Sequence, residues 1–144
     1  MRKDHLRDYA TAAFRFYART GGEEKYIKHL QDAARYGAKG SGVSNPTEGA
    51  LIKKENIIRQ HAAEFEDIKA VEKTLAVMQL SNGIAACKAV EMVYFKDCWK
   101  ELEKGDIENR VHYAELHIPA SRRQIYYWLS KARKLFAYER GLRI

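Results

Sequence analysis

The sequence predicts an all-α protein with a helical N-terminal part, a long central helix and a C-terminal helix-turn-helix. Apolar residues recur at three- and four-residue steps in successive segments, which is the spacing of amphipathic helices. Only two prolines occur among 144 residues, and glycines or short polar runs separate the periodic segments. Together these observations favour helices along the whole chain.

The overall composition indicates a basic globular protein, either one domain or one small domain with a helical annex. The chain is 46% hydrophobic and 31% charged, with a net charge of +7 and a pI near 9.4, which favours a polyanionic partner. No apolar run approaches ~18 residues, so no membrane span is expected. Cys87 and Cys98 fit neither a disulfide framework nor a paired zinc motif, which is typical of a reducing, intracellular compartment.

The N-terminal part, residues 1–36, is predicted to be a pair of helices. The first covers 2–20 and ends at Gly21-Gly22, and its apolar stripe consists of Leu6, Tyr9, Ala13, Phe16 and Tyr17. Three arginines fall mostly off this stripe and are expected on a solvated face, with a DNA role as the alternative: Arg7, Arg15 and Arg19. The second helix runs from Glu23 to about Tyr36, and the residues expected to point inward are Ile27, Leu30 and Ala34.

Residues 37–45, GAKGSGVSN, form the predicted linker, because three glycines and two serines in nine residues cannot support a packed element. This linker is expected to separate the N-terminal pair from residues 46–144. Limited proteolysis is therefore expected to release a stable fragment that begins near Asn45.

The longest helix is predicted over 46–80, with Asn45 as its cap and Pro46 in its first turn. Ser81-Asn82-Gly83 is expected to end it. Its apolar stripe is Leu51, Ile58 and Phe65, spaced by sevens, followed by Ile68, Val71, Leu75 and Met78. Such a stripe suits packing along another helix, either within the chain or across a homodimer. A further helix begins near Ile84 and ends either at Phe95 or at Lys104, before the break at Gly105-Asp106.

The C-terminal segment 108–142 predicts two helices joined by a tight turn. A short first helix over 108–116 has three apolar positions: Val111, Ala114 and Leu116. The turn is expected at His117-Ile118-Pro119, because a residue that precedes proline avoids the helical conformation. Ser121 is then placed to cap a longer helix. Its apolar positions are Ile125, Leu129, Ala132 and Phe136.

The opposite face of the last helix is basic and aromatic. Residues 120–144 contain seven Lys/Arg and one acidic residue, a balance of +6. Lys and Arg neutralise phosphates, and the first turns of a recognition helix reach base edges. Arg122, Arg123, Gln124 and Tyr126 are expected to reach bases, and Lys131, Arg133 and Lys134 to hold phosphates. The full set of predicted DNA-binding residues is Ser121, Arg122, Arg123, Gln124, Tyr126, Tyr127, Lys131, Arg133 and Lys134. Trp128 fits core packing better than nucleic-acid stacking.

Two stretches resemble a known family. VEMVYF at 90–95, followed downstream by ELHIPASRRQIYYWLSKARKLFAYERGL, is similar to region 4 of sigma-70-type factors. It is more similar still to the RinA/ArpU-type late-gene transcription activators of phages of Gram-positive bacteria. The resemblance covers about residues 41–142 and lies in the order of a Gly/Ser-rich loop, a long helix, a tyrosine-containing helix end and a terminal helix-turn-helix.

This resemblance implies a phage or prophage activator that binds double-stranded DNA at a promoter, in the cytoplasm of a bacterial host cell. Two departures affect the expected geometry of the turn. Pro119-Ala120 intervene between Ile118 and Ser121, and the segment 96–110 is several residues longer than in the family.

Two other functions remain open. A small terminase subunit of phage DNA packaging also joins a helix-turn-helix to an oligomerising helix, and an interaction module could contact RNA polymerase with little DNA binding. RNA polymerase and a second copy of the chain, docked along the long helix, are therefore further candidate partners. No phosphate loop, nucleophile with its base or metal motif is evident, so neither catalysis nor a metal or cofactor is expected. None of the five histidines belongs to a metal motif; they are His5, His29, His61, His112 and His117.

Overall fold

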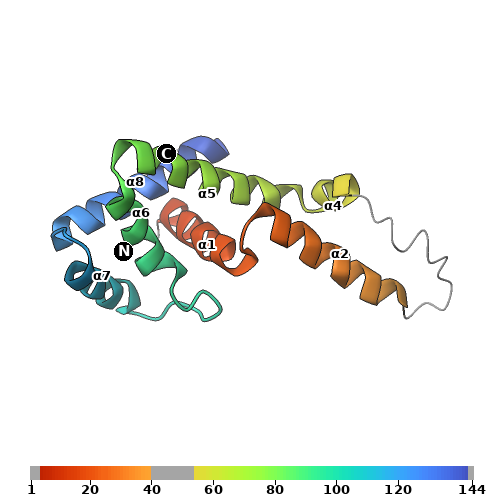
Figure 1. Ribbon diagram of the computed structural model, residues 1–144, viewed down its shortest axis with the longest axis horizontal. Helices are drawn as coiled ribbons and strands as arrows, with labels where there is room; N and C mark the ends of the chain where they lie inside the picture. Colours follow the sequence, from red (N-terminus) through yellow and green to blue (C-terminus); the bar gives the residue numbers. More distant parts are fainter. Residues whose placement is uncertain (1–3, 40–53, 143–144) are drawn as a thin grey trace.

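The computed structural model describes residues 4–39 and 54–142, and every regular element in these residues is a helix (Figure 1). This confirms the predicted all-α fold. The elements are α1 (His5–Thr20), α2 (Glu23–Lys39), α4 (Lys54–Gln60), α5 (Ala62–Ser81), α6 (Ile84–Val90), the π-helix η1 (Glu91–Phe95), α7 (Asp106–His117) and α8 (Arg122–Arg140).

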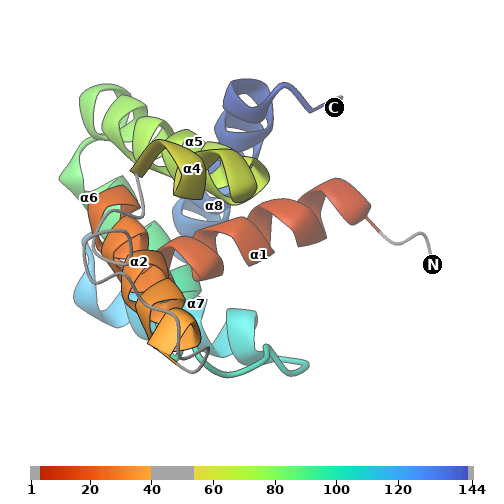
Figure 2. The same cartoon turned by 90° about the vertical axis from the view of Figure 1, so that its right-hand side faces the viewer.

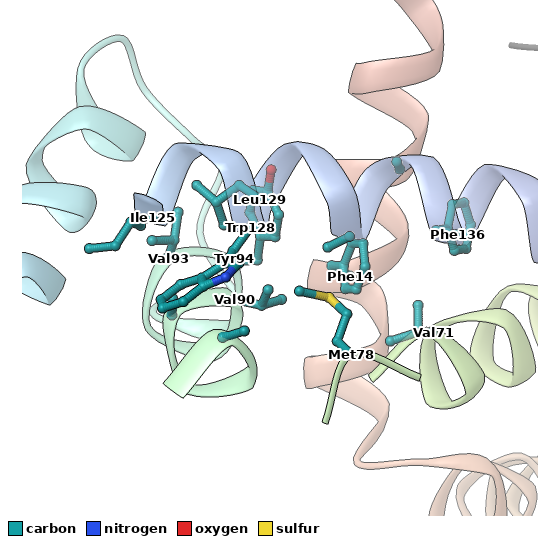
Figure 3. Packing of buried hydrophobic residues seen from close by; sticks show 14 of the residues in the cluster. Phe14, Val71, Met78, Val90, Val93, Tyr94, Ile125, Trp128, Leu129 and Phe136 are labelled. Carbon is teal, nitrogen blue, oxygen red and sulfur yellow. The ribbon is translucent and has the colours of Figure 1, made fainter. Parts of the chain in front are cut away.

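The main core lies where α1, α5, α6, η1, α7 and α8 meet. α5 and α8 pack extensively on each other, and α1 contacts both of them (Figures 1 and 2). The Phe14 ring of α1 lies 5.5 Å from the ring of Tyr94 and 5.9 Å from that of Phe136, measured between centroids (Figure 3). Such aromatic contacts add to the stabilisation from buried area. α1 therefore completes the core that supports α8.

A smaller cluster joins α2 and α4 to the start of α5. Ile27, Ile57, Phe65 and Ile68 are its buried members, and the rings of Tyr26 and Phe65 lie 5.3 Å apart. In Figure 1 these two helices extend away from the end of the molecule that contains α7. The cluster confirms the inward positions expected for Ile27, Phe65 and Ile68.

The buried face of α1 differs from the predicted stripe. Ala10, Ala13 and Phe14 are buried, whereas Tyr9 is 40% exposed and its hydroxyl donates to Asp67 Oδ1 at 2.8 Å. Arg15, expected on a solvated face, is only 5% exposed. The prediction for Arg15 was therefore wrong, and its partners are described with the site below.

The N-terminal helices are not separated from the rest of the core. α2 continues to Lys39, so the first three residues of the predicted linker 37–45 are helical. The rest of that linker, together with the cap at Asn45-Pro46, lies outside the described residues. Because Ala10, Ala13 and Phe14 belong to the main core, a fragment that begins near Asn45 lacks part of it.

The predicted long helix is interrupted at His61, where φ is −118° and ψ is 34°. The break allows α4 to pack on α2, which leaves Ile57 only 3% exposed. The His61 ring stands edge-on to Tyr26, and the Tyr26 hydroxyl hydrogen-bonds to Glu64 in the first turn of α5. A single continuous helix was therefore a wrong prediction, because contacts with α2 override the local preference for one. Beyond the break, Val71 and Met78 are buried as predicted.

The helical segment that begins at Ile84 ends at Phe95 and does not continue to Lys104. α6 passes directly into η1, and Lys96 then adopts an extended conformation with ψ 133°. A non-helical segment over 96–105 leads to α7, which begins after Gly105 with a left-handed φ of 88°. In Figure 1 this segment forms the long loop between η1 and α7.

Candidate nucleic-acid interface

α7 and α8 are joined by four residues, 118–121. Ile118 has an extended conformation, with φ −122° and ψ 138°, as expected for a residue before proline. The Ser121 hydroxyl accepts a hydrogen bond from the backbone N–H of Gln124 at 3.2 Å and so caps α8. The predicted break and cap are both confirmed. Since α6 packs on α8, η1 on α7, and α7 on α8, these elements form a compact helix-turn-helix unit.

The inner face of α8 fixes the helix to the core. Its four predicted apolar positions, Ile125, Leu129, Ala132 and Phe136, are all buried. Figure 3 shows Ile125, Leu129 and Phe136 along this face. Trp128 is 7% exposed and belongs to the same cluster, so the packing interpretation of Trp128 is confirmed. This anchoring determines which side chains of α8 face the solvent.

The solvent-facing side of α8 carries Arg123, Tyr127, Lys131 and Lys134, which we call the outer stripe. Their spacing of four, four and three residues places them along one face of the helix. Three of them are exposed and Lys131 is half-buried. Among the described residues none of the four side chains has a hydrogen-bond or ion-pair partner. The stripe is therefore a row of cations and one phenol that is free to meet a ligand.

Arg122 and Gln124 flank the outer stripe at the start of α8. The Arg122 Nε lies 3.6 Å from Glu115 Oε2, and its Nη2 lies 3.1 Å from His112 Nδ1. Arg122 therefore leans toward α7 and is partly neutralised there. The Gln124 side chain is exposed and, within the described residues, has no hydrogen-bond partner.

Arg133 lies on another side of α8 from the outer stripe. Its Nη1 donates to the Tyr94 hydroxyl at 2.7 Å, which ties the middle of α8 to η1. Tyr126 lies about one and a half turns before the half-buried Lys131 and is 38% exposed. Together with Arg133, it lines a groove between α1, the segment 98–102 and α8. The structure thus divides the predicted DNA-binding residues between the outer stripe, the α7 side and this groove.

A buried arginine that sequence analysis missed holds the segment after η1. Arg15 Nη1 donates to the carbonyls of Tyr94 and Lys96 at 3.0 and 3.1 Å. Its Nη2 donates to those of Asp97 and Lys100 at 2.7 and 2.6 Å. Both terminal nitrogens of the guanidinium are therefore fully used in hydrogen bonds.

Two further arginines support the same region. Arg19 Nη1 donates to the Cys98 carbonyl and Arg110 Nη1 to the Val93 carbonyl, each at 3.0 Å. Burial lowers the pKa of Arg15, and the positive charge of Arg110 lowers it further. An arginine remains cationic after such a shift, so Arg15 stays a donor to these carbonyls.

A groove of about 980 Å³ runs between α1, the segment 98–102 and α8. Its lining includes Arg7 from α1, Trp99 and Lys100 from the segment, and Tyr126 and Arg133 from α8. The Trp99 side chain is 79% exposed. The groove therefore brings cations and aromatic rings together beside the helix that also bears the outer stripe.

Comparison with protein-family models, curated proteins and solved structures gave no match to this chain. Within residues 4–39 and 54–142, no three His, Cys, Asp or Glu side chains are arranged to hold a metal ion. In the same residues no helix has both the length and the apolar character that crossing a bilayer requires. A functional hypothesis therefore depends on the geometry of α7, α8 and the groove.

Proposed function

We propose that this protein binds double-stranded DNA sequence-specifically through α8 and acts as a transcription regulator. The observation that carries the proposal is the outer stripe: unpaired cations on the exposed face of a helix that follows a four-residue turn. In helix-turn-helix proteins the second helix enters the major groove, and its first turns contact base edges.

The first turns of α8 supply the side chains for base readout. Arg123 and Gln124 lie in the first turn of α8 and are exposed. Arginine pairs with the O6 and N7 of guanine, and glutamine with the N6 and N7 of adenine. Tyr127, one turn later, is 55% exposed and can contact a thymine methyl group or a phosphate.

The later part of the outer stripe supplies phosphate contacts. Lys131 and Lys134 lie about two and three turns after Arg123, where the helix leaves the groove. Arg122 takes a separate role, because Glu115 and His112 hold its guanidinium toward α7. A phosphate that approaches the turn competes with Glu115 for this cation.

The resemblance to RinA/ArpU-type activators supports a promoter as the target and activation as the outcome. One alternative function is DNA packaging, in which the protein would be a small terminase subunit. A ring of about eight or more subunits would favour this alternative.

The other alternative is an interaction module. Its supporting feature is the outer surface of α7, where Leu116 is 72% and Tyr113 45% exposed. Such a module would bind RNA polymerase with little dependence on Arg123.

The test compares Arg123→Ala with Lys134→Ala on duplexes selected from a random pool and on unrelated duplexes. We expect Arg123→Ala to cost on the order of 1–3 kcal/mol at the selected site and little on unrelated DNA. Lys134→Ala should weaken both kinds of DNA and lower the slope of log affinity against log salt by about one.

Lys28→Ala is the matched control, since Lys28 is an exposed cation on α2 and should change neither affinity. Helical content is compared by circular dichroism for all variants. Equal losses from Arg123→Ala and Lys134→Ala on both DNAs would contradict base readout. Wild-type binding that does not respond to salt would contradict the DNA proposal as a whole.

A further inference from the structure

We propose that the groove between α1, the segment 98–102 and α8 binds single-stranded nucleic acid. The proposal concerns a different surface from the outer stripe and does not depend on duplex binding there. It follows from three properties of the groove: an ordered loop that presents a tryptophan, cations that the fold leaves available, and a second exposed aromatic ring contributed by α8.

The first property is the way in which the loop is held. The carbonyls of Lys96, Asp97, Cys98 and Lys100 all accept hydrogen bonds from Arg15 or Arg19. Since these carbonyls face the core, the loop is fixed from its inner side while Trp99 remains 79% exposed. An indole on a backbone that is already ordered loses little entropy when a ring stacks on it.

The second property is the charge that remains free. Arg15 lines the groove but uses both terminal nitrogens on carbonyls, so it cannot serve a ligand. Within the described residues, the side chains of Arg7 and Lys100 have no polar partner. Arg133 donates one hydrogen bond to Tyr94 and keeps the other donors of its guanidinium.

Acidic side chains do not cancel this charge. Asp8 and Glu101 are the two carboxylates on the lining, against five cations: Arg7, Arg15, Arg19, Lys100 and Arg133. The net charge of the lining is therefore +3, and it favours an anion. Negative charge repeated along a flexible chain is a property of the nucleic-acid backbone.

The third property is the pair of aromatic rings. Trp99 comes from the segment 98–102 and Tyr126 from α8, and the hydroxyl-bearing Tyr94 also belongs to the lining. A cationic groove with exposed rings is the arrangement by which proteins bind single strands without base pairing, because every base has a face that can stack. A paired base in a duplex has both faces covered, so the groove selects unpaired nucleotides.

The test uses the intrinsic fluorescence of the full chain, which contains two tryptophans. Trp128 is buried, so quenching by an added thymidine oligonucleotide of about ten residues reports on Trp99. We expect saturable quenching, and roughly tenfold weaker binding of the oligonucleotide by Trp99→Ala, measured by anisotropy. Trp99→Phe should retain most of the affinity but lose the quenching signal, because phenylalanine still stacks.

Charge variants and matched controls complete the experiment. Arg7→Ala and Lys100→Ala should each lower the salt slope for the oligonucleotide by about 0.7. Tyr138→Ala removes a 74% exposed ring of α8 that lies outside the groove lining, and Lys28→Ala removes a remote cation; both should bind the oligonucleotide like wild type. A uridine oligonucleotide of equal length distinguishes RNA from DNA as the preferred strand.

The groove proposal is overturned if the oligonucleotide does not bind, or if Trp99→Ala and Tyr138→Ala bind it equally well. It is independent of duplex readout, which Arg123→Ala tests. Loss of duplex selectivity in Arg123→Ala with unchanged oligonucleotide binding supports two separate surfaces. Oligonucleotide binding without any duplex binding would overturn the proposed function and leave the groove assignment intact.

Discussion

At the scale of single residues, Arg15 has the largest structural consequence. Its guanidinium satisfies four carbonyls between Tyr94 and Lys100, a segment without regular backbone pairing beyond Phe95. A buried carbonyl without a donor costs about 1–3 kcal/mol. Arg15 therefore makes most of the side-chain hydrogen bonds, within the described residues, that hold the start of the segment between η1 and α7.

Arg15→Ala should lower the free energy of unfolding by about 3–5 kcal/mol, because it leaves several carbonyls without donors. Arg15→Lys should recover only part of this loss, since an ammonium lacks the planar fork that reaches separate carbonyls. Urea unfolding followed by circular dichroism measures both effects. Arg7→Ala, an exposed arginine two turns earlier, is the control and should stay within about 0.5 kcal/mol of wild type. Equal stability of the Arg15 and Arg7 variants would contradict this role.

Local patterns predicted some residues well and others poorly. The cap at Ser121 and the buried face of α8 were predictable, because both depend only on residues that are close together in the sequence. Arg15 was not, since its partners lie 79 to 85 residues away. For the same reason the sequence could list the cations of α8 but could not tell that Arg133 is engaged by Tyr94 and Arg122 by Glu115.

At the scale of elements, the start of α8 combines two roles. Ser121 caps the helix, and in the proposed function the same turn lies near the DNA backbone. A capped helix start also carries a partial positive charge, which favours a phosphate nearby. Stability and binding can therefore be separated by the choice of capping residue.

Ser121→Ala should destabilise the protein by about 1 kcal/mol through loss of the cap. Ser121→Asp should keep the stability of wild type, because aspartate caps equally well, but should weaken duplex binding by placing a carboxylate near phosphates. Thermal unfolding and duplex titration at two salt concentrations measure the pair. Tight duplex binding by Ser121→Asp at low salt would place the DNA away from this turn.

The helix boundaries show where local signals stop being sufficient. Glycine-marked ends were predicted close to their true positions, as at Gly21, which has a left-handed φ of 76° and bonds back to Tyr17. The break at His61 was not, because it depends on Tyr26 and the packing of α4 on α2. The end at Phe95 was likewise ambiguous, because the donors for the Tyr94 and Lys96 carbonyls come from α1.

At the scale of the whole molecule, α1 is part of the unit that presents α8. Phe14 packs between Tyr94 and Phe136, and Asp67 of α5 accepts from both Tyr9 of α1 and Arg140 of α8. The hydrogen bond with Asp67 also raises the pKa of Arg140. α1 therefore supports the candidate interface directly.

A chain that begins at residue 45 should consequently lose its cooperative unfolding transition, contrary to the stable fragment expected from the linker pattern. Removal of Phe14, Ala13 and Ala10 exposes the facing side of the core. Calorimetry of this fragment measures the effect, and addition of a peptide covering 4–20 should restore helical signal and a transition. A fragment that unfolds cooperatively without the peptide would show that α1 is dispensable.

The contact between Arg15 and the loop also bears on how the protein forms during synthesis. Lys100 follows Arg15 by 85 residues, which at about 5–20 residues per second takes a ribosome roughly 4–17 seconds. The synthesis of α1 is therefore complete while the carbonyls that it must bind are still being made. Because these acceptors are synthesised so much later than α1, we expect the loop to become ordered only after they have been made, with α1 the segment that a nascent-chain chaperone shields longest.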